Sequence, residues 1–159
     1  MKPKILSKKV KYKGIWLKIE ETKVKLVTGK VVKHERIVAP DAVAIVAIDN
    51  QKNIYLAKEW RSAWEKEILQ IPAGECKGKT KKEIKKQAQN ELREEVGLNA
   101  KKLNKLVTCL FGARERKKIH IFLATNLFES KKEREDSEII EVVKMHFQKA
   151  YNLFLSSKE

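Results

Sequence analysis

Three glutamates within the stretch QAQNELREEVGL, residues 87–98, have types and spacings that could do chemistry. Glu91, Glu94 and Glu95 are neighbours if the stretch is helical, and like charges at such spacings repel one another. No Lys or Arg stands three or four residues from any of them, although the chain has 36 of these residues. The cluster therefore has no cation at the helical positions that neighbour it, and its neutralising charge must come from elsewhere.

The helix that carries these carboxylates has clear sequence boundaries. Thr80 followed by Glu83 makes a capping box, and Gly97 is a good residue to end a helix that runs to about Val96. The apolar positions between these limits recur every four residues and should face the core, namely Ile84, Ala88 and Leu92. The pattern predicts one long amphipathic helix.

The same periodicity brings two of the carboxylates close to the apolar stripe. At about 100° per residue, Glu91 and Glu95 fall within about 60° of the centre of that stripe. Carboxylates at the edge of a buried face are costly unless they are compensated. A hard divalent cation such as Mg²⁺ compensates them, because it takes carboxylate oxygens and bridges to phosphates. The alternative is an exposed acidic helix end that pairs with lysines of other segments, and spacing alone leaves both interpretations open.

The sequence predicts β-strands both before and after the helix. Residues 8–38 contain β-prone runs with a hairpin turn at 28–30, and the continuous apolar run at 42–48 is typical of a strand buried on both faces. Further strands are expected at 54–60, 67–71, 106–111, 119–127 and 139–147, with a loop at 131–138 and a short helix at 148–157. These elements predict an α+β domain with one prominent helix packed on a sheet.

Composition narrows the class of protein. A chain of 159 residues, with 42% hydrophobic and 36% charged residues, is typical of one globular domain. No apolar run approaches the roughly 20 residues that span a bilayer, and the basic N-terminus lacks the apolar core of a signal peptide. Cys76 and Cys109 are too few for a disulfide framework, so we expect a cytoplasmic protein.

The formal net charge of +15 is the most distinctive bulk property. It would attract a polyanion such as nucleic acid, an anionic membrane face or a phosphorylated small molecule. The alternative is a Lys- and Glu-rich surface of the kind found in heat-adapted proteins. Such a surface explains the large number of charged residues but not the excess of 36 basic over 21 acidic residues. Both interpretations therefore stay open.

Several segments in order resemble one known family. Glu91-Leu92, Glu94-Glu95 and Gly97-Leu98 are similar to the second half of the Nudix box, and EILQIPAG at 67–74 is similar to the strand and turn that open it in ADP-ribose pyrophosphatase-type members. AKEWRSA at 57–63 and the strands on either side of the helix also fit, over roughly residues 10–150. The chain thus resembles the Nudix hydrolase superfamily, ADP-ribose pyrophosphatase-like.

This resemblance implies a fold and a domain plan. The Nudix fold is a mixed β-sheet sandwiched by helices, here with N-terminal antiparallel strands. We expect a single domain over residues 1–159, in which 39–147 form the catalytic core and 148–159 the C-terminal helix. ADP-ribose pyrophosphatases commonly exchange N-terminal strands in a homodimer, and residues 1–38 are suited to this role.

The resemblance also implies a metal-dependent reaction, the hydrolysis of a diphosphate linked to another group, with Mg²⁺ or Mn²⁺ as the cofactor. Glu91, Glu95 and the backbone carbonyl of Ala73 would be metal ligands, and Glu94 would be a further ligand or a catalytic base. In relatives of this type a base often comes from a late acidic loop. The candidates there are Glu133, Glu135, Asp136 and Glu138, of which Glu135 and Glu138 are favoured.

Substrate contacts are expected from three further segments. Arg61 stands where the family directs an arginine toward the phosphates, although a strand-end salt bridge is its alternative role. Trp60 is a candidate for stacking on a base unless it belongs to the core, and Gln70 stands where relatives often have Glu. Arg114 and Arg116 belong to FGARERKK, which replaces the usual Ser-Pro-Gly loop and could contact phosphate.

The departures from the family pattern define the alternatives. Asn90 and Lys82 replace an Arg and a Glu that usually pair, so both partners of that ion pair are lost together and neither is left without the other. The stretch from Gly74 to Asn90 is two residues longer than usual, so the loop at 75–81 must bulge. We expect a nucleoside-diphosphate hydrolase, with ADP-ribose the first choice of substrate. The alternatives are a Nudix hydrolase of other nucleotides or RNA 5′ ends, and a non-catalytic domain that binds nucleotide or RNA.

Overall fold

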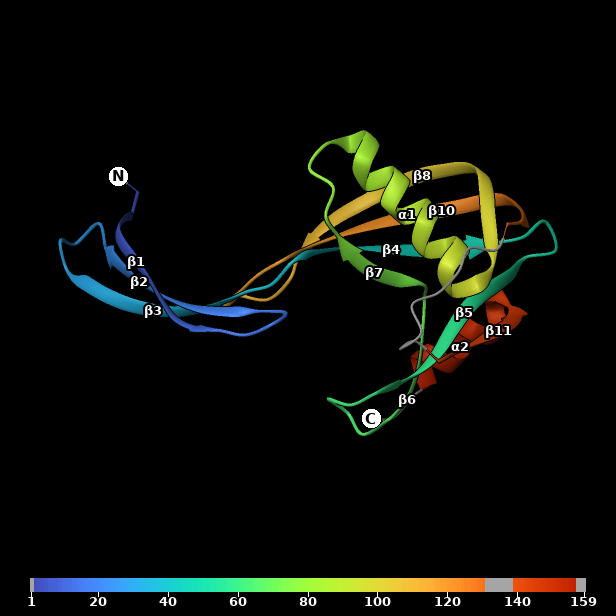
Figure 1. Cartoon of the computed structure of the whole chain (residues 1–159), viewed down its shortest axis with the longest axis horizontal. Coiled ribbons are helices and arrows are strands. Elements are labelled where there is room, and N and C mark those ends of the chain that lie inside the picture. The colour runs from blue at the N-terminus through green and yellow to red at the C-terminus, as the bar shows by residue number, and fades with distance from the viewer. Residues whose placement is uncertain (1, 131–138, 157–159) are drawn as a thin grey trace. The chain divides into compact units, whose positions relative to one another are not determined.

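The computed structural model describes residues 2–130 and 139–156, and the chain forms two compact units. Unit 1 comprises residues 1–41 and 109–119, and unit 2 comprises residues 42–108 and 120–159. No helix in the described part of the chain is both long enough and apolar enough to cross a membrane. Each unit has its own sheet (Figure 1).

Unit 1 is built on a sheet with the strand order β1-β2-β3-β9. The strands are β1 (Lys4–Lys13), β2 (Lys18–Lys25), β3 (Val31–Val38) and the short β9 (Glu115–Arg116). β1, β2 and β3 pair antiparallel in sequence, and β9 joins β3 in parallel. Between β2 and β3, the Leu26 N–H donates to the Lys30 carbonyl at 2.8 Å, and Gly29 has a φ of 83° that glycine adopts without strain. The hairpin predicted at 28–30 is confirmed.

Unit 2 contains the larger sheet, with the strand order β11-β5-β4-β10-β8, while β6 pairs with β5 and β7 pairs with β4. The strands are β4 (Asp41–Ile48), β5 (Asn53–Arg61), β6 (Lys66–Gln70), β7 (Ala73–Cys76), β8 (Leu98–Leu110), β10 (Lys118–Glu129) and β11 (Ile140–His146). β8 begins directly after the long helix, eight residues earlier than the predicted strand at 106–111. β7 and β9 were not predicted, because each is too short for a periodic pattern.

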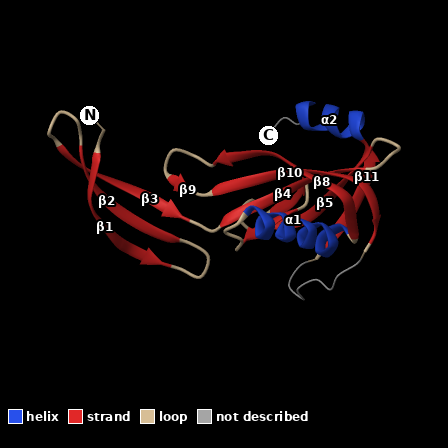
Figure 2. Ribbon diagram, turned by 90° about the horizontal axis from the view of Figure 1, so that it is seen from above, coloured by secondary structure: helices blue, strands red, loops and turns tan. Residues whose placement is uncertain are grey.

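Two helices, α1 (Lys81–Val96) and α2 (Phe147–Ser156), lie on opposite sides of the unit 2 sheet (Figure 2). On the α1 side, buried Ala88 and Leu92 pack in one cluster with Val43 and Ile45 of β4. On the α2 side, Ala150 packs with buried residues of β5 in a second cluster. Alternate residues of a strand point to opposite faces, so a sheet covered on both faces needs apolar residues throughout its central strands. The predicted α+β class with a sheet between helices is confirmed.

Both predicted ends of α1 are confirmed. The Thr80 hydroxyl accepts the Glu83 N–H at 3.2 Å, and the Glu83 carboxylate accepts the Thr80 N–H at 2.9 Å and the Lys79 N–H at 2.8 Å. These backbone donors, Thr80 first, hold the pKa of Glu83 below its ordinary value. Gly97 ends the helix with a φ of 72°, and its N–H donates to the Arg93 carbonyl at 3.1 Å. The caps therefore fix where the glutamates fall along the helix.

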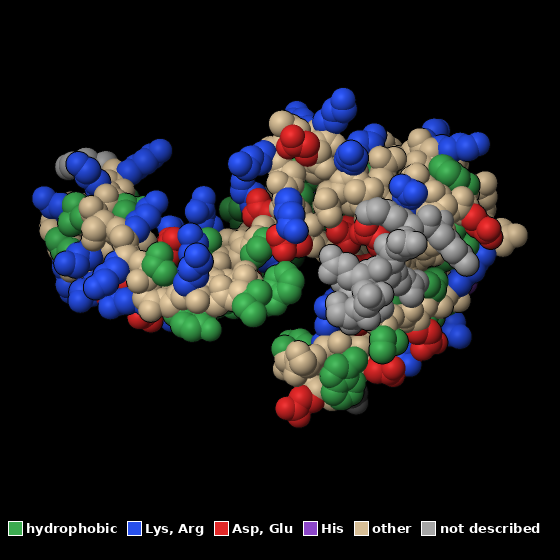
Figure 3. Space-filling model, in the orientation of Figure 1, with side chains coloured by type: hydrophobic (Ala, Val, Ile, Leu, Met, Phe, Trp, Pro, Cys, Tyr) green, Lys and Arg blue, Asp and Glu red, His purple; other side chains and the backbone are tan. Residues whose placement is uncertain are grey.

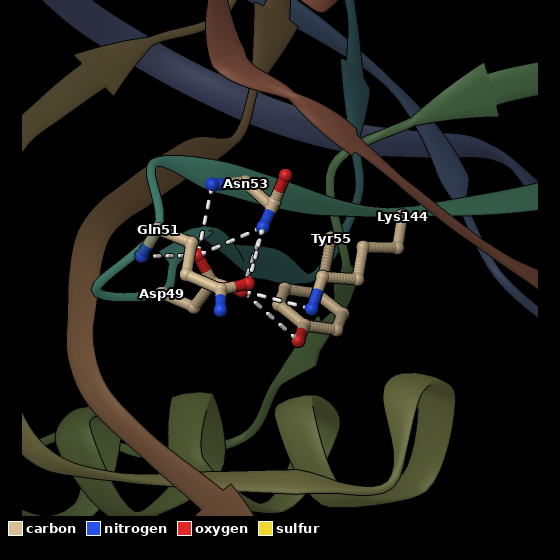
Figure 4. Close-up of polar contacts among 5 residues, drawn as sticks. All are labelled: Asp49, Gln51, Asn53, Tyr55 and Lys144. Carbon is tan, nitrogen blue, oxygen red and sulfur yellow. Dashed lines mark hydrogen bonds and ion pairs between the residues drawn. The ribbon is translucent and has the colours of Figure 1, made fainter.

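Asp49 organises the turn between β4 and β5 and ties it to β11 (Figure 4). Its Oδ1 accepts the backbone N–H groups of Gln51 and Asn53, both at 2.9 Å, and its Oδ2 lies 3.0 Å from the Lys144 ammonium. Burial alone would raise the pKa of Asp49, but the donors from Asn53, Lys144 and Gln51 outweigh it and lower this pKa. The neighbouring Tyr55 hydroxyl and the Asp49 carboxylate in turn raise the pKa of Lys144.

Candidate active site

A short turn beside α1 provides the platform of the candidate site. Pro72 is fully buried between β6 and β7, and its carbonyl accepts the Ile45 N–H of β4 at 2.8 Å. Proline has a fixed φ, and this backbone hydrogen bond ties the segment to the central sheet. Residues 72–74 are therefore tied to β4, and β7, which begins at Ala73, also contacts α1.

Glu95 leans from the last turn of α1 onto this platform. The Ala73 N–H donates to both carboxylate oxygens of Glu95, at 3.3 and 3.2 Å. The Glu95 residue is only 4% exposed, which makes it one of the few buried charged residues in the described chain. A carboxylate in such a place is costly without hydrogen-bond donors or a cation, and the Ala73 N–H supplies one donor.

Glu91, one turn earlier on α1, lies against the neighbouring glycine. A Cβ added to Gly74 would stand 2.2 Å from Glu91 Oε2 and 2.4 Å from its Cδ, distances at which something must move. The Gln87 side-chain amide donates to Glu91 Oε1 at 2.7 Å and fixes the orientation of the carboxylate. The close approach of Glu91 to the backbone of β7 thus depends on residue 74 having no side chain.

The two carboxylates and the backbone of the 72–74 turn form a set of oxygen-rich groups that suits a hard divalent cation. The glycine that makes room for Glu91 and the burial of Glu95 are the features of this structure that fit such an ion. Glu94 is half-buried on the same helix. Among residues 2–130 and 139–156, no three carboxylate, His or Cys side chains are gathered as a metal-binding group.

The other predicted contacts in unit 2 lie on the β5-β6 hairpin. Arg61 forms an ion pair with Glu59 at 2.9 Å, which is the strand-end salt bridge considered from the sequence. Trp60 is 59% exposed, so its alternative role as a core residue is wrong. Gln70 is paired with Ala57, and its amide nitrogen is buried without a hydrogen-bond partner in the described chain. A buried donor that is left without an acceptor is costly, and it is a natural contact for a ligand.

The remaining predicted residues lie elsewhere. Arg114 and Arg116 belong to unit 1, where they line a cavity together with β3. Glu135 and Glu138, with the rest of the acidic loop at 131–138, lie outside the described residues. The structure therefore brings Glu91, Glu95 and Ala73 together and leaves the assignment of a base from this loop as a prediction.

Two contributors to the site were missed from the sequence. Gln87 stands four residues before Glu91, a spacing at which helical side chains meet, and this signal could have identified it as the donor. Gly74 was read as part of a turn, whereas its lack of a Cβ is what admits the Glu91 carboxylate. His120 of β10, which the site does not use, is buried beside Thr108, with its Nδ1 3.0 Å from the hydroxyl.

Comparison with known proteins supplies the context for this geometry. No family model matches the chain. The chain is 32% identical to an ADP-ribose pyrophosphatase of Bacillus subtilis (strain 168) over 156 residues, which cover 96% of this chain and 83% of the relative. It is 29% identical to a methanol dehydrogenase activator of Bacillus methanolicus over 145 residues, 87% of this chain and 76% of that protein.

A solved structure is similar over nearly the whole chain. The crystal structure of an ADP compounds hydrolase matches with a TM-score of 0.85 and 24% sequence identity. The match covers 98% of this chain and 84% of that one. At this identity the likeness concerns the fold, and it confirms the arrangement of sheets and helices predicted from the sequence.

Proposed function

The chain belongs to the Nudix hydrolase superfamily, among its ADP-ribose pyrophosphatase-like enzymes, and from this premise we propose that it hydrolyses ADP-ribose to AMP and ribose 5-phosphate. The observation that carries the proposal is the packing of two α1 carboxylates against the 72–74 turn. The name of the Bacillus subtilis relative supports ADP-ribose as the substrate.

In this proposal, residues of both the 72–74 turn and α1 bind the metal ion. Glu91, Glu95 and the Ala73 carbonyl would hold Mg²⁺ or Mn²⁺, and Glu94 would be a further ligand or accept a proton from water. A divalent ion bound there neutralises diphosphate charge and lowers the pKa of a coordinated water. The Ala73 N–H and the Gln87 amide keep the two carboxylates oriented, so that little reorganisation is needed during the reaction.

The proposed reaction breaks one phosphorus–oxygen bond of the diphosphate. A water oxygen attacks one phosphorus of the diphosphate, the bond from that phosphorus to the bridging oxygen breaks, and the bridging oxygen leaves with the other phosphate. The water proton passes to a carboxylate, for which Glu94, Glu135 and Glu138 are the candidates. Arg61, Trp60 and Gln70 would contact the substrate, and the buried amide of Gln70 would gain an acceptor from it.

The proposal includes a homodimer formed through unit 1. Every residue of β1 is exposed, and Ile5, Val10 and Tyr12 are each about half exposed. No helix covers this sheet within the described residues of unit 1. Apolar side chains on an uncovered sheet favour association with a second copy of the chain. Sedimentation across a range of concentrations tests this, and Val10→Lys should shift the dimer toward monomer. We also propose a cytoplasmic location.

Turnover measurements test the function. Wild-type protein should release AMP from ADP-ribose only with Mg²⁺ or Mn²⁺ present, and more slowly from other nucleoside-diphosphate compounds in a panel. Glu91→Gln and Glu95→Gln should each lower kcat/KM by about 10²–10³-fold, the scale on which a preorganised charged group contributes. Glu35→Gln, an exposed carboxylate on β3, is the matched control and should be unchanged.

Three results would contradict the proposed function or its substrate. Full activity of both Glu91→Gln and Glu95→Gln, with circular dichroism showing folded protein, would remove these residues from the mechanism. Turnover of RNA 5′ ends or another nucleotide in preference to ADP-ribose would keep the metal site and replace the substrate. A folded protein that binds ADP-ribose without releasing AMP at any metal concentration would indicate a binding domain.

A further inference from the structure

A cavity in unit 2 lies beside the first half of α1, and the proposed hydrolysis gives it no role. Its volume is about 330 Å³, at the low end of the range of small-molecule sites in proteins, about 300–1,000 Å³. Residues of α1, β8 and β10 form its walls. Its described lining residues include neither Glu91 nor Glu95 nor the 72–74 turn, so the cavity is separate from the proposed metal site.

The floor of the cavity is apolar. Leu103 of β8 and Phe122 of β10 are each only 3% exposed, and both belong to the buried cluster through which α1 packs on the sheet. Ile84 of α1 lines the cavity from the other side and is partly buried against the same cluster. It stands four residues before Ala88, so both lie on the stripe of α1 that faces the sheet. A ligand in this cavity would therefore contact apolar side chains of the helix and of the sheet.

The rim of the cavity is cationic. Lys81 and Lys85 are four residues apart on α1, a spacing at which helical side chains are neighbours. Lys105 stands two residues after Leu103 on β8, and strand residues at this spacing point to the same face of a sheet. Among the described residues, no carboxylate lines the cavity, and none forms an ion pair with these three lysines. Three positive charges thus surround an apolar floor without an anion from the protein.

We propose that this cavity binds a small organic acid, a molecule with an apolar body and one carboxylate. The apolar body would contact Ile84, Leu103 and Phe122, and the carboxylate would lie at the rim, where lysine ammonium groups on flexible stems can reach it. A nucleotide fits this lining poorly, because its sugar and base need hydrogen-bond partners and Asn104 is the one uncharged polar side chain in the described lining. The proposal stands whether or not the chain hydrolyses ADP-ribose.

Isothermal titration in EDTA, with octanoate as the probe, tests this binding without any turnover. Octanoate should bind saturably, and 1-octanol, which has the same chain without the charge, should bind more weakly. From butanoate through hexanoate to octanoate, affinity should rise by up to about fourfold for each added methylene, the gain expected from its burial. AMP should not compete with octanoate.

Variants test the part played by the lysines. Lys81→Gln/Lys85→Gln should weaken octanoate binding by about three- to tenfold, the scale of one or two exposed ion pairs, and should leave 1-octanol binding unchanged. Lys101→Gln/Lys102→Gln makes the same change in charge at two exposed residues of β8 that do not line the cavity, and it should bind octanoate like wild type. Methyl NMR locates the ligand, because octanoate should shift the resonances of Ile84 and Leu103.

Four results would overturn the proposal. One is the absence of saturable octanoate binding to folded wild-type protein. Another is equal weakening in the two double lysine variants, which would make the effect one of net charge alone. The third is displacement of octanoate by AMP, which would indicate a nucleotide site. The fourth is a set of methyl shifts at exposed Ile15 and Leu155 instead of Ile84, which would indicate unspecific binding to apolar surface. In Glu91→Gln/Glu95→Gln, octanoate binding should be unchanged, and this separates the cavity from the proposed hydrolytic site.

Discussion

The two units of the chain differ most in how they handle charge. Unit 1 contains 16 Lys and Arg against 5 Asp and Glu, whereas unit 2 contains 20 against 16. Most of the net charge of +15 thus belongs to the smaller unit, where Lys and Arg side chains are spread, among apolar ones, over the face of β1-β2-β3 that Figure 3 shows. A Lys- and Glu-rich surface adopted throughout the chain would be balanced in both units. The basic excess is therefore a local property of unit 1, which favours an anionic partner for that unit.

The units also differ in how they bury apolar residues. Unit 2 has buried clusters on both faces of its sheet, and its charged site residues are packed against the sheet through α1. Unit 1 exposes apolar residues along β1 and in the loop that follows it, where Ile15 is 94% and Trp16 is 72% exposed. Unit 2 therefore holds its candidate site residues in a packed environment, whereas unit 1 leaves apolar side chains exposed.

The largest effect of adding a single methyl group is expected at Gly74 in unit 2. Gly74→Ala places a Cβ where the Glu91 carboxylate now lies, so the carboxylate must move away from the turn. We expect ADP-ribose hydrolysis to fall by about 10–100-fold, the scale seen when groups that orient metal ligands are lost. The matched control is Gly14→Ala in unit 1, where the nearest atom to the new Cβ is 3.1 Å away in the Tyr12 ring. Equal activity of Gly74→Ala and wild type would show that the position of Glu91 does not matter.

Truncation of an apolar side chain should lower the free energy of unfolding more in unit 2 than in unit 1. Leu92 is fully buried, so Leu92→Ala should lower the free energy of unfolding by about 2–5 kcal/mol. Val10→Ala on β1, at a residue that is 49% exposed, should change it by only about 0.5 kcal/mol in the monomer. Urea denaturation measures both. A cost for Val10→Ala as large as that for Leu92→Ala would show that β1 is buried under the conditions used, as it would be in a dimer.

Removing the Asp49 carboxylate should have a smaller effect, and one that depends on pH. Asp49→Asn should lower the free energy of unfolding by about 1–3 kcal/mol at neutral pH, because charged hydrogen bonds to Lys144 and to the turn are lost. The pKa of Asp49 is lower in the folded chain than its ordinary 3.8, so this stabilisation is complete above the ordinary value and is lost as pH falls below it.

The pH dependence gives this prediction its test. Between about pH 5 and about pH 2, the stability of wild type should fall more steeply than that of Asp49→Asn. Chemical denaturation at a series of pH values measures the two slopes. Parallel slopes would mean that the carboxylate has the same pKa in the folded and unfolded chain.

The smallest of these effects is expected at the start of α1. Thr80→Ala removes the hydroxyl that accepts the Glu83 N–H and should cost about 1 kcal/mol. Because the glutamates of the site lie at the far end of the helix, hydrolysis by the folded variant should be unchanged. Thermal unfolding and turnover measured on one preparation test both statements, and a large loss of activity would show that fraying reaches Glu91.

The sequence predicted best what local rules govern. The ends of α1 follow from Thr80, Glu83 and Gly97, which act within a few residues of one another, and its buried stripe follows from helical spacing. The meeting of Glu95 with Ala73 depends on contacts 22 residues apart, and it was anticipated only through the resemblance to a family. The early start of β8 was missed because LNAKKLNK lacks alternation, and pairing with β10 overrides its weak preference.

Neither the cavity of unit 1 nor the steric role of Gly74 can be predicted from sequence patterns alone. The basic character of FGARERKK is plain in the sequence, but its parallel pairing with β3 brings together residues 37 and 115. Only that pairing makes a cavity of the loop. Likewise, the steric role of Gly74 depends on a side chain from another element, which no spacing rule reports.

Mn²⁺ binding is the measurement that reports on the α1 carboxylates without any need for turnover. Titration of wild-type protein with Mn²⁺, followed by the loss of the free-ion electron paramagnetic resonance signal, should show saturable binding without any substrate. We predict that Glu91→Gln/Glu95→Gln, shown to be folded by circular dichroism, loses this binding, while Glu35→Gln retains it. Equal Mn²⁺ affinity of the double variant and wild type would contradict the claim that these two carboxylates form the metal site.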